Sequence, residues 1–285
     1  MTVWEPSADG RAATAWPSRV EWFDVVGSTN DVVARWLRES TPEVCIAIAD
    51  EQVAGRGRNG RTWTAPSGGA LLCSVGFRPT YLEPALQWRL AAIISLAMAR
   101  AVESSAGLPA DTVRLKWPND LVVRTADGGW SGGMGAAARK LAGVLGETHG
   151  AGTDDSQAVI GIGVNVAWDR ADFPPELATG MTSVAELAPY REVGAHNLFE
   201  TFVALLGPLV DDLRRGAFPS DAWRSRQLTN GAIVRLERPD GSLETVRAVD
   251  VDPGSGALVI ESLLGESPAR AVTVGEIRHV RLAEV

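Results

Sequence analysis

Residues 51–63 read EQVAGRGRNGRTW, and this stretch carries a high local positive charge. Three glycines alternate with Arg56, Arg58 and Arg61, and no acidic residue follows Glu51 within the loop. Glycine frees the backbone, and arginine binds a phosphate or carboxylate through paired hydrogen bonds. We therefore predict an uncompensated cationic loop that is mobile when empty and orders around an anion. The alternatives are a solvated surface loop and an RG-type segment for single-stranded nucleic acid; a Walker A loop is excluded because its GK[ST] ending is missing.

The segments on either side of the loop predict the fold class. VCIAIADEQ (44–52) and ALLCSVGFRP (70–79) are expected to be buried strands. Upstream, Ser28 begins a helix as its N-cap, with Asp31 in capping-box spacing. Downstream, a nearly all-apolar helix over 84–106 is expected to pack on the sheet. Because the order of elements is mixed rather than strictly βαβα, we predict an α+β body. Its remaining strands are expected at 20–27, 112–117, 120–125, 140–150 and 157–168, and its remaining helices at 195–216 and 221–228.

The chain changes character at about residue 229. From there, short alternating segments are broken by PDG, DPGSG and GES turns, which predicts a small antiparallel barrel of SH3-like length and rhythm. We therefore divide the chain into a flexible N-terminal lead-in (1–19), a catalytic domain (20–228) and a C-terminal SH3-like barrel (229–285).

Composition excludes several classes of function. The 285 residues carry a net charge of −8, so a global basic field for nucleic acid is absent and any cationic site is local. The three histidines are scattered, which argues against a histidine-built zinc site and a Ser-His-Asp triad. Cys45 and Cys73 lie in apolar runs and are expected to be buried free thiols, with a disulfide as the unsupported alternative. No N-terminal apolar segment or run of about 20 apolar residues is evident, so we expect a cytoplasmic protein without a membrane span.

Two further stretches can carry chemistry on phosphates. In VRLKWPNDL (113–121), Lys116 precedes a turn that presents Asn119 and Asp120. Oxygen ligands beside a cation suit Mg²⁺ bound together with phosphates, although a Pro-Asn-Asp turn without any ligand is the alternative. Lys140 follows a Gly/Ala-rich connection at the mouth of an apolar strand, where it either reaches into a site or simply snorkels.

A last polar residue lies on a glycine-rich strand. GIGVNV (161–166) offers Asn165, and the glycines leave room for a flat ring nearby. An asparagine amide can pair with the edge of adenine.

Together and in this order, GSTN, Q-x-AGRGRxGRxW, KWPND, KLAG and GIGxN resemble the biotin protein ligases, from about residue 20 to the C-terminal end. The resemblance implies a mixed-sheet catalytic domain of the biotin/lipoate ligase type, followed by the SH3-like barrel. It implies an ATP-dependent, AMP-forming ligase that activates biotin with MgATP to biotinyl-5′-AMP. The biotinyl group then passes to a lysine of a biotin carboxyl carrier protein domain of an acyl-CoA carboxylase, so the enzyme needs no nucleophile of its own.

The resemblance also assigns residues by motif. It implies a catalytic role for Lys140, Arg56 and Arg58. The implied biotin pocket consists of Ser28, Thr29, Asn30, Gln52, Arg56, Gly57, Arg58 and Lys140. The implied ATP and adenylate contacts are Arg58, Arg61, Trp63, Lys116, Asn119 and Asn165, with Asp120 as a candidate Mg²⁺ ligand.

Departures from the family pattern and rival interpretations remain. Only about 19 residues precede the first expected strand, so we expect a monofunctional ligase without a DNA-binding domain, acting as a monomer or weak dimer. The segment 126–139 is longer than the family's usual hairpin, which bears on where Lys140 lies. The alternatives are a lipoate-type protein ligase, whose RR and GGG signature is missing, an RNA-binding protein using GRGRNGR, and an inactive biotin-binding module.

Overall fold

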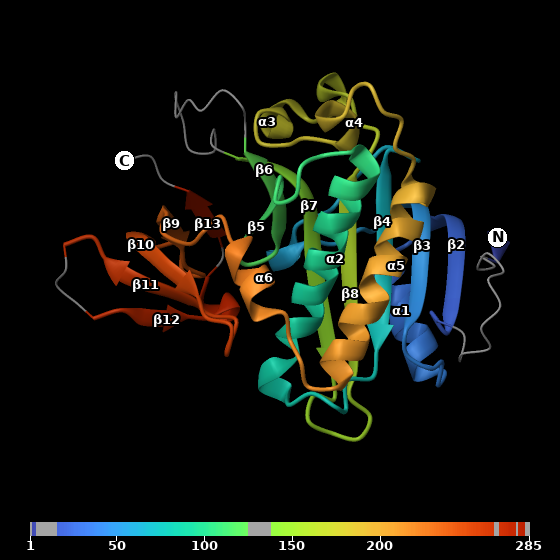
Figure 1. The fold of residues 1–285 in the computed structure, drawn as a ribbon, viewed down its shortest axis with the longest axis horizontal. Coiled ribbons are helices and arrows are strands. Elements are labelled where there is room, and N and C mark those ends of the chain that lie inside the picture. The colour runs from blue at the N-terminus through green and yellow to red at the C-terminus, as the bar shows by residue number, and fades with distance from the viewer. Residues whose placement is uncertain (1, 4–15, 125–137, 265–267, 278, 283–285) are drawn as a thin grey trace.

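The computed structural model describes residues 2–3, 16–124, 138–264, 268–277 and 279–282. An eight-stranded mixed sheet has the order β1-β2-β3-β4-β8-β7-β6-β5, and a five-stranded sheet has the order β12-β11-β10-β9-β13 (Figure 1). The predicted α+β body with a small C-terminal β domain is therefore confirmed. Most of the Gly/Ala-rich connection at 126–139 lies outside the described residues.

The large sheet provides the floor of the site. Its first pair of long strands, β2 and β3, is parallel, and β3, β4, β8, β7, β6 and β5 follow as antiparallel neighbours. Gly143 of β7 lies directly opposite Gly163 of β8, which leaves a stretch of this floor without side chains. The strands are β1 Thr2–Val3, β2 Arg19–Val26, β3 Cys45–Gln52, β4 Ala70–Phe77, β5 Val113–Lys116, β6 Asp120–Arg124, β7 Ala138–His149 and β8 Gln157–Asn165.

Helices cover both faces of this sheet. The helices α2 (Trp88–Ala106) and α5 (Ala195–Arg214) pack side by side on one face, and α1 (Thr29–Arg38) contacts β3, β4 and β8 on the other (Figure 1). Pro84–Ala106 is long and apolar enough to cross a membrane, so the expectation that the chain has no such stretch is wrong. The structure buries most of that segment inside the protein, which accounts for its apolar composition. The short helices are α3 Pro175–Ala178, α4 Val184–Leu187 and α6 Ser220–Ser225, and the 3₁₀ turns are η1 Arg58–Gly60, η2 Pro84–Leu86, η3 Arg170–Asp172 and η4 Val274–Glu276.

The C-terminal domain is fixed to the catalytic domain through aromatic side chains. The indole Nε1 of Trp117 donates to the carbonyl of Gly256 at 2.9 Å. Gly256 has a φ of +72°, and a Cβ there would lie 2.6 Å from the ring of Trp88, so both conformation and space require glycine. The strands of this domain are β9 Ile233–Glu237, β10 Leu243–Val251, β11 Leu258–Ser262, β12 Arg270–Val272 and β13 His279–Leu282.

A buried ion pair ties the end of the catalytic domain to α2. Arg226, which follows α6, donates two hydrogen bonds to the carboxylate of Glu103 on α2, at 2.7 and 2.9 Å. Both side chains are less than a tenth exposed.

Three local expectations meet different outcomes. The lead-in is not simply flexible, because Thr2–Val3 pairs with β2 as β1 and Trp16 packs against the core; residues 4–15 lie outside the described part. Ser28 is the N-cap of α1 but its side chain makes no capping hydrogen bond, so the capping box is wrong. Cys45 and Cys73 are free and buried as expected, and burial raises the pKa of the Cys45 thiol to about 11.

Candidate active site

The glycine-arginine loop is folded back on itself as a short hairpin. The amide of Gly57 donates to the carbonyl of Arg61 at 2.7 Å, and the amide of Trp63 donates to the carbonyl of Gly55 at 2.9 Å. A Cβ on Gly55 would lie 2.4 Å from the carbonyl oxygen of Trp63, so no other residue fits between these two backbones. Hydrogen bonds across the hairpin therefore connect its two sides at Gly57 and Trp63.

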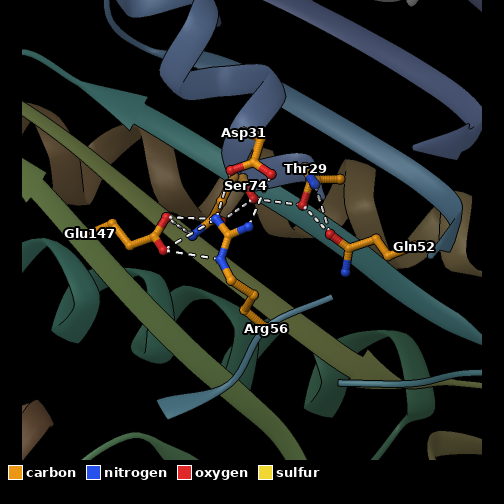
Figure 2. A network of polar contacts seen from close by, with 7 residues as sticks. Thr29, Asp31, Gln52, Arg56, Ser74 and Glu147 are labelled. Carbon is orange, nitrogen blue, oxygen red and sulfur yellow. Dashed lines mark hydrogen bonds and ion pairs between the residues drawn. The ribbon is translucent and has the colours of Figure 1, made fainter. Parts of the chain in front are cut away.

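Arg56 is paired with two carboxylates that come from other parts of the chain. Its guanidinium donates to both oxygens of Asp31, at 2.8 and 3.0 Å, and to the carboxylate of Glu147 at 3.3–3.4 Å (Figure 2). The hydrogen bond with Asp31 and the charge of Glu147 raise the pKa of Arg56, and that same hydrogen bond lowers the pKa of Asp31. The expectation of an uncompensated loop is therefore wrong for Arg56, because its counter-charges lie far away in the sequence.

A cluster of neutral polar side chains, most of which the resemblance assigns to the biotin pocket, lies beside this ion pair. Gln52 Oε1 accepts hydrogen bonds from the amide and the hydroxyl of Thr29, at 2.7 and 3.0 Å. The Thr29 hydroxyl lies 2.7 Å from the hydroxyl of Ser74, which donates to Asn30 Oδ1 at 2.6 Å. Figure 2 shows Gln52, Thr29 and Ser74 next to one another, beside Arg56. The predicted biotin residues Thr29, Asn30 and Gln52 are thus brought together, with Ser28 buried next to them.

Ser74 was missed by sequence reasoning. It lies in the continuous apolar run of β4, where a lone serine in a buried strand was the available signal. Its side chain is fully buried and links Thr29 to Asn30.

The predicted lysines meet at one carboxylate. Asp120 contacts Lys140 Nζ through one oxygen at 2.7 Å and Lys116 Nζ through the other at 3.3 Å. Burial alone would raise the pKa of Asp120, but the two ammonium groups outweigh it and lower the pKa to about 2. The cluster carries two positive charges and one negative charge, which leaves a net positive charge for an anion.

This arrangement does not fit a protein-held metal ion at Asp120. Both carboxylate oxygens face ammonium groups, and a nearby ammonium repels a divalent cation. Within the described residues, no group of three or more His, Cys, Asp or Glu side chains could hold a metal. Assigning Asp120 as an Mg²⁺ ligand is therefore unsupported, and we derive no step through a metal.

Trp63 lies flat on the floor made by the two facing glycines. A Cβ on Gly163 would lie 2.6 Å from its indole ring, and a Cβ on Gly143 would lie 3.1 Å from it. Lys140 Nζ is 5.3 Å from the centre of the same ring, within the range of a cation–π contact. Lys140 therefore touches both the aromatic surface and the charged cluster.

Asn165 keeps one polar atom free. Its Nδ2 donates to the carbonyl of Thr182 at 2.9 Å, which fixes the orientation of the amide. Its Oδ1 is buried and has no hydrogen-bond partner among the residues that the structure describes. A buried acceptor without a partner is costly, so this oxygen is suited to accept from a ligand N–H.

Arg58 connects the loop to the C-terminal domain. Its guanidinium donates to the carbonyls of Val274 and Ile277, at 3.2 and 3.0 Å, and to Asn119 Oδ1 at 3.4 Å. Burial lowers the pKa of Arg58, since its partners are neutral and not carboxylates. Arg58 and Asn119 are thus brought together as predicted, whereas the side chain of Arg61 is exposed.

Comparison with known proteins identifies the relatives of this chain. Residues 22–165 match the biotin/lipoate A/B protein ligase family. A biotin–[acetyl-CoA-carboxylase] ligase of Mycobacterium tuberculosis is 32% identical over 91% of this chain and 89% of its own length. One of Paracoccus denitrificans is 37% identical over 80% of this chain and 89% of its own length. The fold is similar to that of a biotin protein ligase from Aquifex aeolicus solved with biotin and ATP, with a TM-score of 0.72 and 22% identity, over 93% of this chain and 99% of that one.

The chain therefore belongs to the biotin/lipoate A/B protein ligase family, a class of ligases. Within that class, its similarity lies with the biotin protein ligases.

Proposed function

We propose that this protein activates biotin with ATP to biotinyl-5′-AMP and transfers the biotinyl group to a lysine of a biotin carboxyl carrier protein domain. The observation that carries the proposal is the position of Lys140. Its ammonium contacts the carboxylate of Asp120 and lies over the ring of Trp63. A cation beside an aromatic surface and a second lysine is suited to bring a carboxylate tail and a nucleotide phosphate together.

The neutral pocket suits the uncharged head of biotin. Three oxygen–oxygen contacts join Gln52, Thr29, Ser74 and Asn30, but the two hydroxyls supply only two protons. One of these contacts is therefore left without a proton. A ureido group brings N–H donors, which can supply the missing proton to this row.

The first chemical step joins two anions. A carboxylate oxygen of biotin attacks the α-phosphorus of ATP, the new O–P bond forms, and the bond to pyrophosphate breaks. Lys140 and Lys116, with Arg58 from the loop, lower the repulsion between the anions and neutralise the charge that builds on the phosphate oxygens. Asp120 stays ionised at neutral pH, so it orients the lysines and does not accept a proton.

The adenine is recognised by Asn165. Because Nδ2 is held by Thr182, the free Oδ1 can accept from the exocyclic amine of adenine. Guanine presents a carbonyl at the corresponding position and would leave two acceptors facing each other. This arrangement favours ATP over GTP.

The second step needs no enzyme nucleophile. The amine of the carrier lysine attacks the acyl carbon of the mixed anhydride, the bond between that carbon and the phosphate oxygen breaks, and AMP leaves with the phosphate charge. The hairpin keeps water away from the anhydride until the carrier arrives. We place the enzyme in the cytoplasm as a monomer or weak dimer that serves an acyl-CoA carboxylase.

One assay tests this function. Purified protein is incubated with biotin, MgATP and a biotin carboxyl carrier domain, and the mass of the carrier is measured. We expect one biotinyl adduct, which should disappear when the acceptor lysine is replaced by arginine. An adduct with lipoate and none with biotin would overturn the proposal.

A further inference from the structure

Glu147 joins the loop to the pocket. This residue lies on β7, outside the groups so far assigned to binding or chemistry. Its Oε2 accepts from Asn30 Nδ2 at 2.9 Å, and both of its oxygens accept from Arg56 at 3.3–3.4 Å (Figure 2). Glu147 therefore contacts a residue of the biotin pocket and a residue of the loop through one carboxylate.

Asn30 has no freedom to find another partner. Its Oδ1 is taken by Ser74, and a Cβ on Gly161 would lie 2.3 Å from that oxygen, so the amide rests directly on the sheet. Its side chain is buried. Without the Glu147 carboxylate, Asn30 Nδ2 would have no hydrogen-bond acceptor, and the Asn30 amide would be released from its present orientation.

Arg56 depends on Glu147 in a different way. Asp31 already binds its two terminal nitrogens, but the Asp31 side chain is 62% exposed, and such a pair is weak by itself. Glu147 also accepts from Arg56 Nε. Its side chain is 33% exposed, about half the exposure of the Asp31 side chain. The second carboxylate thus fixes the guanidinium from the sheet side.

We propose that Glu147 is a positioning residue that couples closure of the glycine-arginine hairpin to the arrangement of Asn30 in the biotin pocket. The Glu147 carboxylate holds both the hairpin, through Arg56, and the Asn30 amide, so its loss releases both, whereas a change in the other carboxylate on Arg56 loosens the hairpin alone. The proposal rests on the assignment of this pocket to biotin. Its consequence is that Glu147 controls how long the adenylate stays bound.

The isosteric variant Glu147→Gln separates this role from simple packing. Donors approach both carboxylate oxygens, so either orientation of a glutamine amide turns its NH₂ toward a donor. We expect biotin affinity to fall about tenfold and the dissociation of preformed biotinyl-5′-AMP to accelerate about tenfold, as for a lost charge-assisted hydrogen bond that is partly exposed. Trypsin should also cleave the hairpin faster in the ligand-free variant. Glu147→Asp, which keeps two acceptors on a shorter stem, should lie between wild type and Glu147→Gln.

Asp31→Asn is the matched variant. It weakens the other carboxylate on Arg56 but leaves Asn30 paired with Glu147, so trypsin cleavage should rise while biotin affinity stays within about threefold of wild type. Glu83→Gln, an exposed change outside this network, is the neutral control. The proposal is overturned if Glu147→Gln matches Glu83→Gln in biotin affinity and adenylate dissociation, or if Asp31→Asn loses as much biotin affinity as Glu147→Gln. A wild-type protein that does not bind biotin at all would instead refute the proposed function.

Discussion

Adding one methyl group at Gly163 should release the hairpin from the sheet. A Cβ at this position would lie 2.6 Å from Cε2 of Trp63 and 2.8 Å from both Cζ2 and Nε1. Ordinary carbon contacts begin at about 3.5 Å, so the ring must move by roughly 1 Å. The strand cannot move instead, because β8 is paired with β4 on one side and β7 on the other. Overpacking of this kind costs about 1–3 kcal/mol.

The protein can avoid that cost if Trp63 undocks from the sheet and the hairpin opens. The decrease in the free energy of unfolding caused by Gly163→Ala therefore has an upper limit. That limit is the free energy gained when Trp63 docks on the sheet. ATP affinity should fall about tenfold or more, which corresponds to about 1.4 kcal/mol. The measurements are urea unfolding, trypsin cleavage after Arg56, Arg58 and Arg61, and calorimetric binding of ATP.

Alanine substitutions at two glycines of the neighbouring strand β7 should give smaller effects. A Cβ on Gly143 would lie 3.1 Å from both the Trp63 ring and Lys140 Nζ, so Gly143→Ala should loosen the hairpin less than Gly163→Ala; trypsin cleavage, which does not depend on Lys140, measures this. A Cβ on Gly146 would meet only the flexible end of Ile160 at 3.3 Å, so Gly146→Ala serves as the control. The reasoning fails if Gly163→Ala leaves stability, trypsin cleavage and ATP affinity unchanged, or if the three variants behave alike.

Four further predictions follow from the site and the core. Lys140→Ala should lower the rate of adenylate formation at least about a hundredfold without unfolding the protein, because a cation is lost where charge concentrates; pyrophosphate release measures it, and retained adenylation would remove Lys140 from its role. Asp120 has a folded pKa of about 2, below its unfolded value, so its ionisation stabilises the fold by about 2 kcal/mol above pH 4 and this contribution is lost as the pH falls from about 4 to 2. Urea unfolding of wild type and Asp120→Asn across that range checks this, and a pH-independent difference would contradict it. Arg226→Met should lower the free energy of unfolding by about 3–5 kcal/mol because it leaves the buried Glu103 carboxylate without a counter-charge. Replacing Glu103 with leucine as well should recover part of the loss, although the Val113 amide then loses its acceptor; an equally unstable double variant would count against this. Asn165→Ala should narrow the preference for ATP over GTP by about tenfold in steady-state adenylation, and an unchanged preference would show that another group recognises adenine.

The fold class could be predicted from local sequence because burial leaves a local signal. The apolar helix α2, the strands on either side of the hairpin and the turn-rich C-terminal domain each show the expected pattern of apolar residues within one short window. The polar residues that gather in the site were also indicated by their motifs, including Thr29, Gln52, Lys140 and Asn165.

The partners of those residues could not be predicted in this way. Arg56 was expected to have no counter-charge, yet it binds Asp31, 25 positions before it, and Glu147, 91 positions after it. Asp120 was predicted beside Lys116, but its shorter contact is with Lys140, which comes from a different strand. Ser74 gave no motif at all, although it connects two pocket residues.

By itself, the sequence determined which segments are buried and which residue types are available for chemistry, because both follow from side-chain properties and short-range spacing. Only the tertiary structure decided which charges cancel and which remain for a ligand. Strand register places Gly143 against Gly163 under Trp63, and the same sheet brings Glu147 to Asn30 and Arg56. Electrostatic energy depends on distance in space, and that distance is fixed only when the strands and the hairpin have packed.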